Sequence, residues 1–396
     1  MKKLLLLLLV LTGMASTASA KIIYLQNNWG KSNLYVGYGS TTNDGENSWA
    51  QLLSIGKWDS KDVYTVDLGE ATYFRITYSD GQTIYLTSSS FTEGKCYYFD
   101  YVDEKNVLGG PFDITVHTYS FTVDTDPNHD FGTLKIHLFK DASPINGAWG
   151  DNPAMVKDGN VYSYTYRSIP NSGGIGVVFH NDNDADRTED MGASEGANNY
   201  VLMYNSSAAK KIRKAEKVTT NGSGYCTYVN TEALNISAST AYYATDNGNG
   251  NATAHAITNP ATATPMLIKG DASTTYYFEV ATSGTDVSSS NAFHAGTGSG
   301  VAGGDGPYNY ILKGDTFYRA NGNTVASNKA YLQLSVEVPA GAPALVFEDE
   351  DFNITGINAI STVKMENGAY YNLQGVKVAN PAKGLYIHNG KKYIVK

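Results

Sequence analysis

The sequence predicts an all-β protein made of tandem β-sandwich modules followed by a small C-terminal β domain. Apolar and polar residues alternate with a period of two along short segments such as residues 63–68 and 161–166, which is typical of half-buried strands. Turn signals such as Asp158-Gly159-Asn160 separate these segments, and short strands at regular spacing are typical of sandwiches and barrels. The 30 Tyr and 40 Gly residues fit this class, because Tyr suits strands and Gly suits turns.

Residues 1–20 have the pattern of a signal peptide. Two lysines precede an apolar run over residues 4–11, and residues 18–20 are Ala-Ser-Ala, which fits the small-residue rule for cleavage. The apolar run is shorter than the ~20 residues that a membrane-spanning helix needs, and no later segment approaches that length. We therefore expect an exported protein without a transmembrane segment, either secreted or held at the outer cell surface.

Charge and cysteine content narrow the class of protein further. The net charge of −9 argues against nucleic acid as a partner, because binding to phosphates normally needs a basic surface. The one basic run, residues 210–214 with Lys217, is predicted to be a solvated linker between modules. Cys96 and Cys226 are expected to be buried free thiols, although an oxidising compartment would allow them to pair.

An internal repeat organises the first half of the chain. Each copy contains a strand, a polar loop, a Trp and then two further strands. The gap from Val36 to Trp49 in the first copy equals the gap from Ile136 to Trp149 in the second copy. A repeat of this kind indicates two modules with the same fold.

Two further parts follow the repeat. Residues 207–350 contain more strand patterns and one segment, residues 208–217, that is compatible with a helix. A Gly- and Ser-rich stretch over residues 296–306 is predicted to be a flexible loop. The end of the chain is predicted to be a hairpin unit with a tight turn at Asn389-Gly390. The predicted domains are a signal peptide (1–20), a first sandwich module (21–112), a second sandwich module (113–206), a β-rich module of unknown function (207–350) and a C-terminal β domain (351–396).

Three features of the second module resemble the starch-binding modules of bacterial amylases, carbohydrate-binding module family 26. They are the strand over residues 136–139, a loop that runs from Trp149 to Met155, and a strand that ends at Phe179 and continues into a polar loop ending at Thr188. The resemblance implies a β-sandwich that binds starch or a related α-glucan without catalysing a reaction.

Both modules depart from that family pattern. In the second module Gly150 follows Trp149 directly, where the family has Trp-Pro-Gly. In the first module Ala50 follows the Trp, and Leu52 or Leu53 takes the place of the Met. The resemblance therefore implies a sugar site more strongly in the second module than in the first.

The end of the chain resembles the terminal domain of proteins exported by the type IX secretion route. The pieces that carry this resemblance are Asn-Leu-Gln-Gly at residues 372–375, Lys-Gly-Leu-Tyr-Ile at 383–387 and Gly-Lys-Lys at 390–392. The resemblance implies recognition by that secretion machinery, passage across the outer membrane, and then release or attachment at the cell surface.

Sugar binding needs flat aromatic rings on which pyranose faces stack, with polar side chains around the rim. His137 and Phe139 lie two apart on one predicted strand and therefore share a face. For each candidate the alternative is an ordinary core, loop-anchor or turn residue. The predicted platform residues are Trp149, His137 and Phe139 in the second module and Trp49 and Tyr35 in the first. The predicted rim residues are Asn181, Asp182, Thr188 and Gln82.

The sequence predicts no metal, cofactor or catalytic residue. Asp182, Asp184, Asp186 and Asp190 are spaced as calcium ligands could be, but they lack the Gly and Glu of an EF-hand loop, so an acidic turn is expected. Chance matches to the nucleophile-elbow and dinucleotide motifs, at residues 192–196 and 298–303, lack the flanking helices.

Two other functions stay open at this point. The first is a surface adhesin or structural protein whose modules keep the fold without a sugar site. The second is an unrecognised β-sandwich glycoside hydrolase, which would need two carboxylates about 5–10 Å apart across a cleft.

Overall fold

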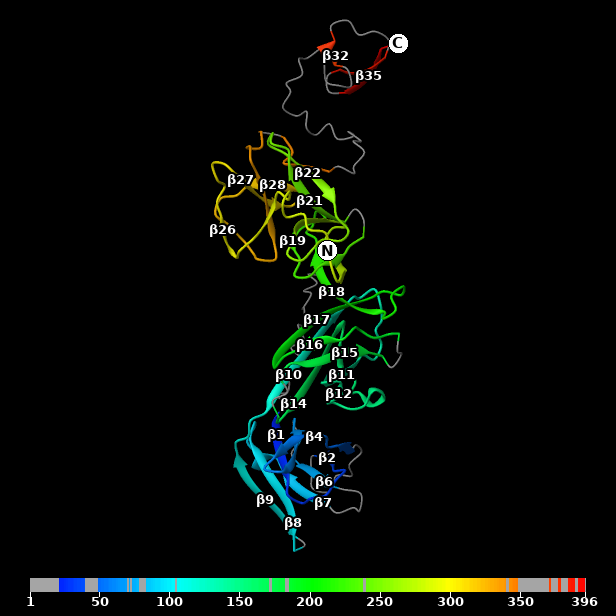
Figure 1. Cartoon of the computed structure of the whole chain (residues 1–396), viewed down its shortest axis with the longest axis vertical. Helices are drawn as coiled ribbons and strands as arrows, with labels where there is room; N and C mark the ends of the chain where they lie inside the picture. The colour runs from blue at the N-terminus through cyan, green and yellow to red at the C-terminus, as the bar shows by residue number, and fades with distance from the viewer. Residues whose placement is uncertain are drawn as a thin grey trace, which may run out of the picture. The chain divides into compact units, whose positions relative to one another are not determined.

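The all-β class is confirmed by the computed structural model of the chain (Figure 1). The chain divides into two compact units, residues 1–213 and residues 214–396. Where it is described, the chain forms strands and short 3₁₀ turns and no α-helix, and no helix in these parts is long and apolar enough to cross a membrane. The structure describes residues 21–39, 49–69, 71, 73–77, 83–103, 105–170, 173–181, 185–237, 240–339, 342–347, 370–371, 377–378, 384–388 and 391–395. The predicted signal peptide lies outside these residues.

The first module has two sheets whose inner faces form one core. Its elements are β1 (Ile22–Asn27), β2 (Tyr35–Gly39), β3 (Trp49–Gln51), β4 (Ser54–Trp58), β5 (Lys61–Asp67), β6 (Tyr73–Thr77), β7 (Thr83–Thr87), the 3₁₀ turn η1 (Ser88–Ser90), β8 (Cys96–Val102) and β9 (Lys105–Phe112). The strand orders are β4-β5-β1-β8-β9 and β3-β2-β6-β7. Ile23, Leu25, Val36, Phe74 and Ile76 are buried between them, as expected from the period of two.

The second module repeats this arrangement. Its elements are β10 (His117–Thr125), β11 (Lys135–Lys140), β12 (Ser143–Pro144), the 3₁₀ turn η2 (Trp149–Asp151), β13 (Val156–Asp158), β14 (Val161–Ser168), β15 (Ile175–His180), β16 (Met191–Ala193) and β17 (Gly196–Tyr204). One sheet contains the order β13-β14-β10-β17 and the other has the order β12-β11-β15-β16. β10 pairs antiparallel with β14 and parallel with β17, just as β1 pairs with β5 and β8. The internal repeat therefore extends to the strand pairing.

The core of the second module is rich in aromatic residues. Tyr119 and Phe121 from β10 and Phe179 from β15 are almost completely buried. The hydroxyl groups of buried tyrosines still find partners, because Tyr119 donates to the carbonyl of Gly173 at 2.9 Å and Tyr162 donates to that of Gly132 at 3.0 Å. Tyr can therefore fill this core without leaving a polar atom unpaired.

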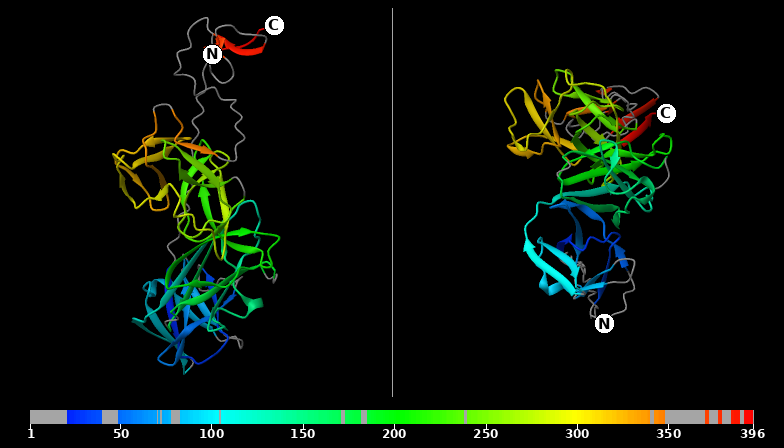
Figure 2. Two further views of the ribbon diagram at one scale, coloured as in Figure 1. Left: turned by 45° about the horizontal axis from the view of Figure 1, so that its top comes forward. Right: turned by 60° about the horizontal axis from the view of Figure 1, so that its bottom comes forward.

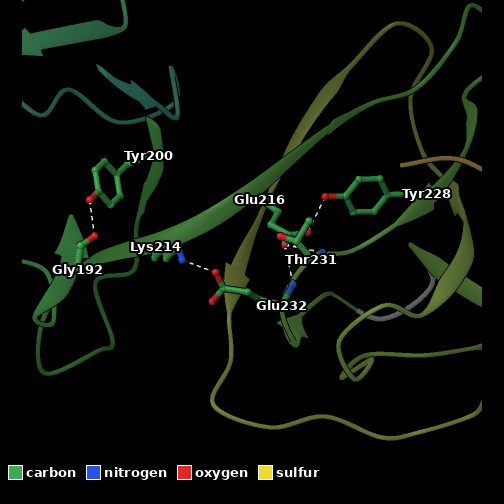
Figure 3. A network of polar contacts seen from close by, with 7 residues as sticks. All are labelled: Gly192, Tyr200, Lys214, Glu216, Tyr228, Thr231 and Glu232. Atoms are coloured by element: carbon green, nitrogen blue, oxygen red, sulfur yellow. Dashed lines mark hydrogen bonds and ion pairs between the residues drawn. The ribbon is translucent and has the colours of Figure 1, made fainter. Parts of the chain in front are cut away.

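The segment that resembled a nucleophile elbow joins a strand of one sheet of the second module to a strand of the other sheet. Residues 192–196 connect β16 to β17, so that a strand follows the turn where an elbow would need a helix. Tyr200 on β17 donates a hydrogen bond to the carbonyl of Gly192 at 2.7 Å (Figure 3). The motif is therefore part of the sheet edge.

The second unit contains two groups of strands. The later group, from residue 293 to residue 334, is yellow and orange in Figure 2. Its elements before the C-terminal tail are β18 (Ile212–Thr219), β19 (Tyr225–Val229), β20 (Leu234–Asn235), β21 (Ala241–Asp246), β22 (Ala252–Ala256), β23 (Pro265–Lys269), β24 (Thr275–Val280), β25 (Phe293–Ala295), β26 (Ser299–Val301), β27 (Tyr308–Lys313), β28 (Thr316–Arg319), β29 (Asn323–Val325), β30 (Ala330–Leu334) and β31 (Leu345–Phe347). A sheet of order β19-β23-β21-β22-β31 and a sheet of order β25-β30-β27-β28 share a core that includes Leu267, Ala244, Leu332 and Leu334.

The segment over residues 208–217, whose sequence is compatible with a helix, is not helical. β18 occupies most of this segment, and its residues Ala215 to Thr219 pair antiparallel with β24. The Ala, Lys and Glu residues favour a helix locally, but pairing with a distant strand overrides such a preference.

The basic run at residues 210–214 is also more than a solvated linker. Lys210 forms an ion pair with Glu189, and the guanidinium of Arg213 lies 3.6 Å from the same carboxylate. Lys211 lies 3.6 Å from the carboxylate of Asp186. These cations therefore neutralise the acidic loop of the second module.

The predicted flexible loop over residues 296–306 contains a strand. β26 lies inside it and pairs antiparallel with β29, with Gly300 opposite Thr324. A Cβ on Gly300 would lie 2.8 Å from the carbonyl oxygen of Gly322. Glycine is therefore needed here for close backbone approach rather than for flexibility.

A buried carboxylate organises one turn of the second unit (Figure 3). Glu216 accepts hydrogen bonds from the hydroxyl groups of Tyr228, at 2.5 Å, and Thr231, and from the backbone N–H groups of Thr231 and Glu232, at 2.8 and 2.9 Å. Lys214 forms an ion pair with the side chain of Glu232. Burial, and then the bond to Glu216, raise the pKa of Tyr228, so its hydroxyl stays a donor.

The C-terminal tail forms a four-stranded antiparallel sheet of order β33-β32-β34-β35. Its strands are β32 (Tyr370–Tyr371), β33 (Lys377–Val378), β34 (Gly384–His388) and β35 (Lys391–Val395). The Asn-Leu-Gln-Gly piece at 372–375 and the turn at 389–390 lie outside the described residues. Both cysteines are buried free thiols, as predicted.

Candidate functional site

The strand β11 presents two aromatic side chains on the outer face of the second module. Ile136 and Leu138 point into the core and are fully buried, so His137 and Phe139 point to the other side of the sheet. Both are half-buried, and their rings lie nearly parallel with centroids 5.7 Å apart. The predicted sharing of one face by His137 and Phe139 is thus confirmed.

A glycine on the neighbouring strand makes room for the Phe139 ring. Gly176 on β15 is the direct cross-strand partner of Phe139. A Cβ on Gly176 would lie 2.1 Å from Cζ of Phe139, a separation that no side chain could occupy. The ring therefore covers the backbone of β15.

The loop after β12 carries Trp149 to the same surface. Asn146 fixes this loop to β11, because its amide group donates to the carbonyl of Ile136 and accepts from the N–H of Leu138, both at 2.8 Å. The half-buried indole of Trp149 stacks on His180 with centroids 4.2 Å apart and contacts His137 edge-on at 5.2 Å. These contacts gather Trp149, His137 and Phe139 into one cluster, called here the aromatic surface.

Two buried residues support the Trp149 ring from below. His180 is fully buried, and its Nε2 lies 2.9 Å from Oδ1 of Asn152. Because an amide oxygen only accepts, Nε2 of His180 is the protonated nitrogen. The guanidinium of Arg187 lies 5.3 Å from the centre of the Trp149 ring, within the range of a cation–π contact.

His137 is held in its neutral form. Burial lowers its pKa, while hydrogen bonding to Asn152 and the negative charge of Asp190 act in the opposite direction with smaller effect. Its Nδ1 atom is buried and has no hydrogen-bond partner among the described residues. A protonated ring would leave this N–H unpaired, so the surface is built for an uncharged imidazole.

The predicted rim residues have different surroundings. Asn181 is exposed, and its backbone N–H donates to the carbonyl of Asp186 at 3.2 Å. Thr188 is fully buried, and its hydroxyl oxygen accepts the N–H of Phe179 at 3.1 Å. The rim position predicted for Thr188 is therefore wrong, because its side chain closes the loop onto β15. Asp182 and Gln82 lie outside the described residues.

The acidic loop serves contacts within the module. Asp186 accepts a hydrogen bond from the hydroxyl of Tyr204 at 3.0 Å and lies next to Lys211. Within the described ranges, no group of three or more His, Cys, Asp or Glu side chains is placed to hold a metal ion.

In the first module, Tyr35 and Trp49 lie on the sheet of order β3-β2-β6-β7. Tyr35 on β2 is half-buried and pairs with Gln51 and Thr77 on the flanking strands. Trp49 begins β3, where its backbone lies opposite Gly37.

The two tryptophans do not occupy equivalent positions, although their spacing from the preceding strand is equal. Leu52 donates its N–H to the carbonyl of Leu34, and Met155 donates to that of Leu134, both at 2.8 Å. Leu52 is therefore the structural counterpart of Met155. Trp49 lies in the paired strand just before Leu52, whereas Trp149 lies further back in a loop, so the two Trp residues differ in backbone position.

Sequence reasoning missed the residues that support the surface. Asn146, Asn152 and Arg187 carried no signal as members of a site, because each is common in polar loops. The one available clue was His180, the polar residue at the end of the otherwise apolar strand β15. It lies under Trp149 and bonds to Asn152.

The fold and the site together define a chain of β-sandwich modules with an aromatic cluster on one sheet face. No model of a protein family and no curated protein matches this chain. A solved structure with some likeness is the family 26 carbohydrate-binding module of Eubacterium rectale Amy13K in complex with maltoheptaose, at 14% identity and a TM-score of 0.18, covering 46% of this chain and 91% of that one. Another is the product complex of the multi-modular, glycogen-degrading pneumococcal virulence factor SpuA, at 10% identity and a TM-score of 0.18, covering 66% of this chain and 37% of that one.

Proposed function

We propose that the second module binds polysaccharide, with starch or another α-glucan as the ligand, and that it does so without catalysing a reaction. The observation that carries this proposal is the aromatic surface, in which His137, Phe139 and Trp149 lie together and half-exposed on one sheet face. Aromatic rings offer apolar faces to the C–H groups of a sugar at low entropic cost. Asn181 follows His180 in the chain and is exposed, and its side-chain amide, which donates a long hydrogen bond of 3.5 Å to Asp186, is the group proposed to bond sugar hydroxyls.

The charges around the surface favour binding over hydrolysis. A glycosidase needs a carboxylic acid whose pKa is raised, so that it can donate a proton to the leaving oxygen. The carboxylate of Glu189, in the loop beside the surface, has its pKa lowered by its hydrogen bond to Lys210. Asp186 is taken up by Tyr204 and Lys211. Both groups are therefore suited to neutralising the basic run rather than to acid catalysis.

The proposed cellular setting is the outer surface of a bacterium. The signal-peptide pattern of residues 1–20 and the sorting-domain pieces of residues 372–392 support export. Two sandwich modules in one chain would also suit a long polymer, since linkage raises the effective concentration at a second contact.

The test is binding of the mature chain, residues 21–396, to insoluble starch, with cellulose as the control polymer. We expect the protein to sediment with starch and not with cellulose, and to release no reducing sugar from it. Failure to bind any glucan would contradict the proposal and favour an adhesin or structural role. Release of reducing sugar would favour a hydrolase.

A further inference from the structure

A lysine and a cysteine meet in the second unit at an unusually short separation. Nζ of Lys329 lies 2.7 Å from Sγ of Cys226. That length falls at the lower end of the range for N–H···O bonds, about 2.7–3.2 Å, and sulfur is a larger atom than oxygen. The pair is therefore closer than a hydrogen bond between an ammonium group and a thiol requires.

The backbone holds both residues firmly in place. Cys226 lies on β19, and Lys329 directly precedes β30. Val229 donates its N–H to the carbonyl of Asn328 at 3.1 Å, and Ala330 donates to the hydroxyl of Thr227 at 3.2 Å. These bonds on either side of the pair fix the backbone of β19 against that of β30, which brings the two side chains within reach of each other.

The pair also lies where a small oxidant can reach it. Cys226 and Lys329 both line a cavity of about 420 Å³ whose other walls include Thr220, Tyr225 and Leu312. Lys329 is only half-buried. The other thiol, Cys96, is completely buried, and burial raises its pKa to about 12, so it stays protonated and unreactive.

We propose that Cys226 and Lys329 form a covalent S–O–N bridge under oxidising conditions. One oxygen atom bonded to both Sγ and Nζ would hold them at about the separation observed, because two single bonds meeting at a bent angle span such a distance. The first stage is the usual oxidation of a cysteine sulfur by peroxide. A second peroxide oxidises the neighbouring amine to a hydroxylamine, and the oxygen of that group attacks the sulfenic sulfur and expels water, which closes the S–O–N link.

The reaction balances with hydrogen peroxide as the oxidant. One thiol, one neutral amine and two molecules of peroxide give the bridge and three molecules of water. The S–H bond, one N–H bond and both O–O bonds break, and the S–O and O–N bonds form. Sulfur and nitrogen together lose four electrons, and each peroxide accepts two. A dithiol such as dithiothreitol would reverse the change, with the bridging oxygen leaving as water.

The test is peptide mass spectrometry of the mature chain after treatment with hydrogen peroxide. Digestion with a protease that cleaves at acidic residues should give a linked pair of peptides that contain Cys226 and Lys329. The mass of the pair should equal the sum of the two peptides plus one oxygen and minus two hydrogens, and it should disappear after dithiothreitol. Cys96 in the same sample is the internal control and should remain a free thiol.

The variant K329R keeps the positive charge and removes the reacting amine. It should give no linked pair, and its Cys226 should instead carry sulfenic or sulfinic acid. The proposal is overturned if the unmodified chain yields Cys226 oxidised alone with Lys329 unchanged, or if no linked pair forms while Cys226 stays reduced.

Discussion

Replacing Trp149 with alanine separates the two roles that the structure gives this residue. The substitution removes the stacked contact with His180 and the cation–π contact with Arg187. An aromatic pair is worth about 0.5–1.5 kcal/mol and a cation–π contact at an exposed site about 0.5–1 kcal/mol. The first unit should therefore lose about 1–2.5 kcal/mol of unfolding free energy, less than the ~3–5 kcal/mol expected for a fully buried Trp.

The same substitution should also weaken binding to starch, for a reason that is independent of folding. If a glucose ring stacks on the indole, removal of this contact is worth about 1–3 kcal/mol, so the dissociation constant for soluble starch should rise about 5- to 150-fold. Affinity electrophoresis in soluble starch measures the binding, and thermal melting measures the stability. At about 2–4 °C per kcal/mol for a unit of this size, the melting temperature should fall by roughly 2–10 °C.

Trp58 provides the matched control. It is a solvent-exposed Trp at the end of β4 in the first module, so W58A removes an indole of the same size away from the aromatic surface. Its migration in starch should equal that of the unmodified chain. If W149A melts at a lower temperature but migrates in starch like the unmodified chain, Trp149 only anchors its loop, and the reasoning that makes it a binding residue is refuted.

Three further changes test other parts of the structure. G176A should weaken starch binding several-fold and cost about 1–3 kcal/mol of stability, because the new Cβ displaces the ring of Phe139; unchanged binding would mean that this ring is not part of the site. E216Q keeps the shape of the side chain but weakens four hydrogen bonds, so chemical denaturation should show a loss of about 1–3 kcal/mol in the second unit; no loss would contradict the organising role of Glu216. Because the pKa of His137 is lower in the folded protein than in the unfolded chain, its contribution to the unfolding free energy is fully present above the unfolded-state pKa, near 6.5, and is lost as the pH falls below that value. The melting temperature of H137N should lack this part of the dependence on acid pH. If H137N and the unmodified chain gave the same dependence of melting temperature on pH, the neutral imidazole would be contradicted.

The strands could be predicted from the sequence because their signal is local. Along β6, Phe74 and Ile76 are buried while Tyr73, Arg75 and Thr77 are only half-buried, and this alternation is visible in the sequence itself. The segment over residues 208–217 failed for the opposite reason. Its composition favours a helix, and only its pairing with β24, some sixty residues later, makes it a strand.

The candidate site could be predicted only in part. His137 and Phe139 were predictable, since alternation alone places them on one face of β11. Thr188 was misplaced, because a hydroxyl that accepts a backbone N–H nine residues away looks the same in the sequence as one on a polar rim. The tryptophans show the same limit, because their equal spacing conceals a difference in strand register that only the partners of Leu52 and Met155 reveal.

The parallel pairing of β10 with β17, the first and last strands of the second module, has a consequence for how the chain is made. β10 is the first strand of its module to be synthesised, and it lies between β14 and β17. One of its edges therefore stays open until β17 has been completed. Closure over such a sequence separation is slow, on the order of milliseconds to seconds, and an open apolar edge can meanwhile pair with another chain. A truncated or duplicated gene would have to keep whole modules intact, since a break anywhere between β10 and β17 leaves that edge open for good.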